Sequence, residues 1–142
     1  MGLDLKHGKA ELVRAAMEGI ALNLRLRLDI LRKYVQIEDE ILLVGGGSKS
    51  RLYRRIFADA YNTTVLKTNV DQDAAALGAA ALAAVGCGYW PDFSRIDAIH
   101  QVVEVMTPDP ENTRVYEKLL PIFDAAADYQ SKLGAMLHAI EL

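Results

Sequence analysis

The part of this sequence best suited to bind a ligand is a run of glycines and small polar residues that follows four apolar residues at 41–44. The run reads Gly45-Gly46-Gly47-Ser48-Lys49-Ser50. An apolar run that ends in glycine is typical of a strand buried on both faces of a parallel sheet. Glycines at its carboxyl end let a ligand approach bare backbone, and open α/β sheets bind their ligands at that edge. The pattern indicates either a gap for a phosphate or nucleotide, or a tight strand-to-helix turn without a ligand.

Neither of the two common phosphate-binding motifs fits this run. A Walker loop needs glycine, lysine and serine or threonine in direct succession, whereas here Ser48 separates Gly47 from Lys49. A dinucleotide-binding fingerprint needs a third glycine where the helix opens, and this chain has Ser50 at that position. The glycine content alone therefore does not identify the ligand.

No other group of residues forms a convincing catalytic or metal site. Three histidines lie far apart and share no metal-ligand spacing: His7, His100 and His138. Cys87 lies between two glycines with no basic residue beside it, so an activated thiolate has little support. We therefore predict no catalytic residue and no metal site within this chain.

The elements on either side of the glycine run are predicted from local patterns. The apolar run belongs to a strand at about 40–44, and Ser50 is placed to cap a helix over 51–61 that stops at Asn62. The segment 63–68 is rich in β-branched residues and should form a second strand. Because the two strands are joined through a helix, the second should return parallel to the first.

Two further helices flank this unit. An apolar stripe at helical spacing over 8–34 predicts a long amphipathic helix. Its other face is expected to be solvated and carries Arg14, Glu18, Arg25, Arg32 and Lys33. An alanine-rich helix over 74–85 surrounds Gly78, which suggests either close packing of the helix against a sheet or direct contact of a ligand with that glycine. Asp71 or Asp73 can cap this helix, which explains them more simply than Mg²⁺ binding.

The carboxyl-terminal part of the chain is predicted to contain a short extended segment and a long helix. Val102–Met106 is extended and is stopped by prolines that follow it. A helical pattern then covers 111–140, and Pro121 should kink or divide it.

Composition limits the class of protein. The chain has 142 residues, of which 51% are apolar and 25% charged, as expected for one compact domain. The net charge of -3 gives no electrostatic reason to expect nucleic acid as a partner. The amino terminus has no apolar signal core, and no apolar segment is long enough to span a membrane. We expect one unit over residues 1–142 that is soluble and cytoplasmic.

Four segments, in the right order along the chain, resemble the carboxyl-terminal domain of the FGGY carbohydrate kinases, and xylulokinase-like members above all. The segments are Arg14-Ala15-Ala16-Met17-Glu18-Gly19-Ile20-Ala21, Leu43-Val44-Gly45-Gly46-Gly47-Ser48-Lys49-Ser50, Ala58-Asp59 and Ala76-Leu77-Gly78-Ala79-Ala80-Ala81-Leu82-Ala83. The resemblance covers a core of residues 3–93, and 94–142 resemble the less specific helical tail of these enzymes. It implies an α/β fold: part of a ribonuclease-H-like domain of the actin-like ATPases, helix-rich with a small parallel sheet.

The resemblance also implies roles for the glycine run. Gly45, Gly46 and Gly47 would form the backbone floor under the adenosine and inner phosphates of ATP, and Ser50 would lie near the adenine. Gly78 and its alanines would belong to a hinge-like helix between domains. The complete enzyme would use ATP and Mg²⁺ and would phosphorylate a hydroxyl of a sugar or polyol.

Much of such a kinase is not found in this sequence. The amino-terminal domain, which carries the sugar site, the catalytic aspartate and the phosphate-binding loops, has no counterpart here, and only two neighbouring strands of a five-stranded sheet remain. We therefore predict a kinase fragment that forms the adenosine-side wall of the nucleotide site and is inactive alone. Two alternatives stay open: a noncatalytic module that self-associates through an exposed sheet edge, and a sensor that binds ATP or ADP without turnover.

Overall fold

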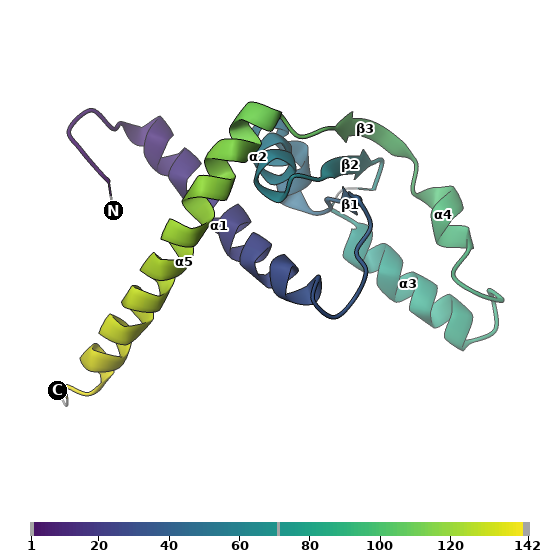
Figure 1. The fold of residues 1–142 in the computed structure, drawn as a ribbon. Coiled ribbons are helices and arrows are strands. Elements are labelled where there is room, and N and C mark those ends of the chain that lie inside the picture. Colours follow the sequence, from purple (N-terminus) through teal and green to yellow (C-terminus); the bar gives the residue numbers. More distant parts are fainter. Residues whose placement is uncertain (1, 71, 141–142) are drawn as a thin grey trace.

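The predicted order of helices and strands is found in the computed structural model, which describes residues 2–70 and 72–140 (Figure 1). Its elements are α1 (Lys9–Leu31), β1 (Glu40–Leu42), the 3-10 helix η1 (Gly46–Lys49), α2 (Arg51–Tyr61), β2 (Thr64–Thr68), α3 (Ala74–Gly86), α4 (Arg95–Ile99), β3 (Val102–Met106) and α5 (Pro110–His138).

The sheet has the strand order β1-β2-β3 and is mixed. As predicted, β1 and β2 are parallel, with Glu40 opposite Thr64. β3 then adds to the other side of β2 in antiparallel orientation, with Met106 opposite Val65. The expectation of two strands was therefore wrong, because pairing with β3 joins residues about 40 positions apart and leaves no local signature in the sequence.

The core lies around α2. This helix presents Ile56, Phe57 and Tyr61 to the interior, and the rings of Phe57 and Tyr61 meet edge to face with centroids 5.1 Å apart. Other buried core residues come from α1, β2, β3 and α5: Ala21, Leu22, Val65, Met106 and Tyr116. The sheet and two long helices thus pack on one short helix, and that helix begins at the glycine run.

The local signals that begin and end α2 are confirmed. The Ser50 hydroxyl accepts a hydrogen bond from the Tyr53 backbone N–H at 3.2 Å, which is the predicted cap. Asn62 ends the helix with a φ of 50°, in the left-handed region that asparagine tolerates better than most residues. At the next helix, Asp73 is at the N-cap position without a side-chain cap bond, and Asp71 lies outside the described residues.

The polar face of α1 is not simply solvated, as the sequence suggested. Arg25 donates to the backbone carbonyl of Ala60 at 2.7 Å, which ties α1 to the end of α2. Glu18 accepts from Arg14 at 2.8 Å and from the Tyr116 hydroxyl at 2.9 Å. These bonds hold α1 against α2 and α5, which it meets in Figure 1.

The predicted division of the last helix at Pro121 was wrong. α5 continues through Pro121 to His138, because strong helix formers lie on both sides, and the alternative outcome, a kink at Pro121, stays a prediction. Gly78 has open space around it: a side chain added there would meet no atom within 4 Å. The close packing predicted at this glycine is not made by the described residues, and α3 extends away from the core in Figure 1.

Candidate functional site

The glycine run forms a tight turn between β1 and α2. Gly45 has a φ of 85° and a ψ of -173°, a conformation that side chains other than glycine rarely adopt. Its carbonyl accepts the Ser48 backbone N–H at 3.1 Å and the Ser48 hydroxyl at 2.7 Å. The Ser50 N–H closes the next turn on the carbonyl of Gly47 at 3.1 Å. The backbone of this turn is therefore fixed by short-range hydrogen bonds.

The three glycines serve different purposes. Gly45 is required by its positive φ. Gly47 is required by space, because a Cβ atom there would lie 2.8 Å from two ring carbons of Tyr53. Gly46 meets neither demand: its φ is not positive, it is exposed, and a Cβ atom would have nothing within 4 Å. Of the three, Gly46 presents bare backbone to solvent without an internal reason for lacking a side chain.

Arg54 supports the turn from the buried side. It exposes only 4% of its surface and donates through Nη1 to the carbonyl oxygen of Ser48. Its Nη2 donates to Oε2 of Glu104 in β3 at 2.6 Å. This hydrogen bond lowers the pKa of Glu104 below its ordinary value. One guanidinium thus joins the glycine turn to the sheet.

A buried carboxylate fixes the other end of α2. Asp59 is 2% exposed, and its Oδ1 accepts the Asp109 backbone N–H at 2.8 Å and Arg55 at 3.3 Å. Its Oδ2 accepts the side-chain amide of Asn112 at 3.0 Å. Asp59 therefore attaches the beginning of α5 to the helix that follows the glycine turn.

The sequence and fold match those of known sugar kinases. Residues 1–87 match the model of the FGGY family of carbohydrate kinases, C-terminal domain. The chain belongs to this family. A xylulose kinase of Staphylococcus epidermidis is 32% identical over 141 residues, which are 99% of this chain and 28% of that protein. A glycerol kinase of Natranaerobius thermophilus is 34% identical over 113 residues, 79% of this chain and 22% of that protein.

Solved structures confirm the FGGY kinase fold. The crystal structure of ligand-bound xylulose kinase from Lactobacillus acidophilus superimposes with a TM-score of 0.77 at 30% identity, over 92% of this chain and 26% of that one. The predicted resemblance and fold class are thereby confirmed, with the small sheet mixed rather than wholly parallel. The chain spans about a quarter of the length of the kinases it matches, 28% of the staphylococcal protein.

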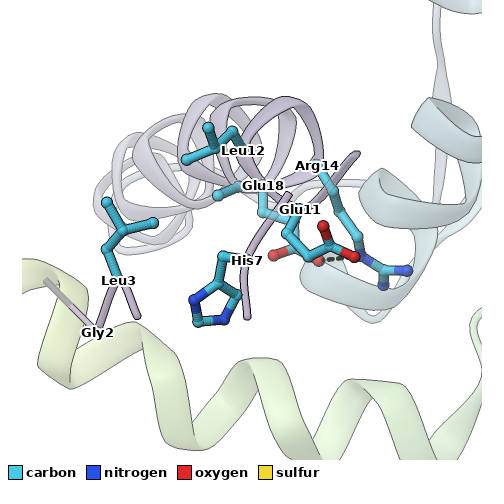
Figure 2. A pocket seen from close by; sticks show the side chains of 8 residues that line it. Gly2, Leu3, His7, Glu11, Leu12, Arg14 and Glu18 are labelled. Carbon is cyan, nitrogen blue, oxygen red and sulfur yellow. Dashed lines mark hydrogen bonds and ion pairs between the residues drawn. The ribbon is translucent and has the colours of Figure 1, made fainter. Parts of the chain in front are cut away.

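A hollow of about 510 Å³ lies away from the glycine turn, at the amino-terminal end of α1. Figure 2 shows that its side chains come from the segment before α1 and from one face of that helix. They are Leu3, His7, Glu11, Leu12, Arg14 and Glu18, with Gly2 and Ala15 completing the wall. Its polar side chains have partners within the chain: Glu11 accepts the Gly8 N–H at 2.9 Å, His7 Nδ1 accepts the Asp4 N–H at 2.9 Å, and Arg14 donates to Glu18. These pairings account for the charges without a ligand.

The remaining sequence candidates stay apart from the turn. Cys87 is exposed at the end of α3. Within residues 2–70 and 72–140, no three histidine, cysteine, aspartate or glutamate side chains are grouped so as to hold a metal ion. No helix in the same ranges is long and apolar enough to cross a membrane.

Sequence reasoning missed the structural roles of Arg54, Asp59 and Glu104. Asp59 carried a usable signal, because a charged residue three positions after Ile56 falls on the apolar side of the predicted helix. Arg54 and Glu104 carried none, since they meet only after β3 has paired with β2, 50 residues further along the chain.

Proposed function

We propose that this chain is part of an ATP-dependent carbohydrate kinase, and that its glycine turn forms the adenosine-side wall of the nucleotide site. The enzyme would transfer the γ-phosphoryl group of ATP to a hydroxyl of a sugar or polyol. The observation that carries the proposal is the exposed Gly46 backbone at the end of β1, in a chain that belongs to the FGGY kinases. A cytoplasmic location goes with this proposal, since ATP and sugars are available there.

The turn offers an adenosine two kinds of contact. A flat base or ribose can pack on the backbone at Gly46, because no side chain stands in the way. Ser50 is exposed, and its hydroxyl oxygen already accepts the Tyr53 N–H, which leaves its O–H free to donate to a ring nitrogen or ribose oxygen. Gly45 and Gly47 contribute by holding the turn in shape.

Phosphoryl transfer also needs a base for the attacking hydroxyl and charge neutralisation at the phosphates. Mg²⁺ would normally accompany ATP, but the described residues contain no carboxylate cluster that fits it, so we assign it no ligand here. We therefore expect this chain by itself to have no kinase activity. ATP-dependent phosphorylation of D-xylulose, glycerol or gluconate by the purified chain would overturn that expectation.

The extent of exposed surface supports a role within a larger protein. A folded monomer of 15.6 kDa should expose about 7,200 Å². This chain exposes 10343 Å², an excess of about 3,100 Å² over that value. Large apolar side chains contribute to it on α3 and α5, among them Leu82, Ile122, Tyr129 and Met136. The relatives, which are several times longer, have enough additional chain to cover such a surface.

Nucleotide titration tests the proposed wall. Isothermal titration of the chain with ATP and ADP should show saturable binding, and Gly46→Val should abolish it without changing the circular dichroism. Gly134→Val, in α5 and also surrounded by open space, is the matched control and should bind like the unmodified chain. Equal affinity of the Gly46 and Gly134 variants would refute the assignment.

Self-association is a second candidate function, favoured by the free edge of β1 and by the exposed apolar surface. β1 lies at one edge of the described sheet, with β2 on its only paired side. Light scattering distinguishes the two: a stable dimer without nucleotide affinity would favour a structural module. Saturable ADP binding without turnover is expected both of the proposed nucleotide wall and of a nucleotide sensor, and it would count against a purely structural module.

A further inference from the structure

Arg54 is an unusual residue to bury beside a glycine turn. Its guanidinium exposes almost no surface, yet the carboxylate that it bonds, Glu104, belongs to a side chain 38% exposed to solvent. Its Nε is buried and finds no partner among the described residues. Burying a charge is costly unless every donor is satisfied, and apolar replacements of buried ion pairs are often neutral or stabilising. General stability is therefore a weak explanation for this arginine.

The contacts of Arg54 point to a geometric role instead. Nη1 holds the carbonyl of Ser48, and the Ser48 hydroxyl holds the carbonyl of Gly45. Ser48 is itself fully buried. These two bonds fix Ser48 and Gly45 on the side of the turn that faces the sheet. Gly46, which lies between them in the sequence, is exposed to solvent.

The fork of the arginine is essential to this arrangement. Nη1 and Nη2 belong to one rigid plane, so their two acceptors, in η1 and in β3, are held at a fixed spacing. A lysine keeps the charge but is a single flexible donor group, which cannot set that spacing. Arg55, the next residue, bonds instead to Asp59 and to the carbonyl of Thr107, at the other end of α2.

We infer that Arg54 is a positioning residue for the nucleotide site: through the Ser48 carbonyl it fixes the turn so that the Gly46 backbone faces the adenosine. The inference rests on the proposed function of the turn. It assigns Arg54 no contact with the nucleotide itself.

Two measurements on Arg54→Lys test the inference. The first is amide hydrogen exchange by NMR at Ser48 and Ser50, whose N–H groups close the turn. Both should exchange at least tenfold faster in the variant, while amides in the middle of α2 keep their protection. The second is the Kd for ADP, which should rise at least tenfold. Arg51→Lys is the matched control, an exposed arginine on the same helix, and should change either quantity less than twofold.

The outcomes separate this inference from the proposed function. Unchanged exchange at Ser48 and Ser50 would overturn the positioning role, as would equally faster exchange throughout α2, which would mean general destabilisation. A loosened turn with unchanged ADP affinity would also overturn it. If the unmodified chain binds no ADP, the proposed nucleotide wall fails for this chain, and the exchange rates alone decide whether Arg54 positions the turn.

Discussion

Replacing Gly47 by alanine should destabilise this chain, whereas the same replacement at Gly46 should not. The new Cβ at position 47 would lie 2.8 Å from Cδ1 and Cε1 of Tyr53, well inside van der Waals contact. The Tyr53 ring cannot move freely, because it packs edge-on against Phe57 with centroids 4.9 Å apart, and Phe57 is only 5% exposed. At position 46 the added methyl group would meet open space.

The difference between the two variants follows from these contacts. Overpacking of a fixed ring costs about 1–3 kcal/mol. Gly46→Ala should lie within about 0.5 kcal/mol of the unmodified chain, because its φ is not positive and an alanine loses less backbone entropy on folding. With a urea m value of about 1.5 kcal/mol/M, Gly47→Ala should lower the unfolding midpoint by about 0.7–2 M.

Urea unfolding followed by circular dichroism measures the effect, and a second substitution tests its cause. Tyr53→Leu removes the ring, so Gly47→Ala made in that background should lose most of its cost. Equal midpoints for Gly46→Ala and Gly47→Ala would refute the assignment of separate roles to the two glycines. So would an undiminished cost in the absence of the Tyr53 ring.

Two further predictions concern the bonds that attach α5. Asp59→Asn places an amide group opposite the N–H groups that donate to the Asp59 carboxylate, and should lower the free energy of unfolding in urea by about 2–4 kcal/mol. Adding Asn112→Asp should recover at least half of this loss, and no recovery would refute the pairing of Asp59 with Asn112. Burial, with the hydrogen bond to Glu18, raises the pKa of Tyr116 to about 12. Because an unfolded tyrosine ionises near 10, the stability from this protonated group should be complete below about pH 10 and lost as the pH rises towards 12. Tyr116→Phe should remove the part of the alkaline loss due to Tyr116, leaving the part due to Tyr61, whose pKa burial also raises to about 12, and should cost about 1 kcal/mol at neutral pH; an unchanged alkaline loss in urea midpoints would contradict it.

Sequence patterns identified the elements whose signals are local. The cap at Ser50, the stop at Asn62 and the order β1, α2, β2 each depend on residues within a few positions of one another, so they could be predicted. The four segments that resemble FGGY kinases were likewise sufficient to predict the family. The pairing of β3 with β2 was not predicted, because the residues that pair lie far apart in the sequence.

What the sequence by itself determined, therefore, is that a glycine turn joins a strand to a capped helix in an FGGY kinase domain. The sequence could not assign separate roles to the three glycines. Those roles depend on the positive φ of Gly45 and on the Tyr53 ring beside Gly47, which appear only in the structure. Nor could the sequence join Arg54 to Glu104, since their side chains meet only when β3 pairs with β2. The physical reason is that backbone propensity acts over one or two helical turns, whereas packing and buried hydrogen bonds join residues that only the folded chain brings together.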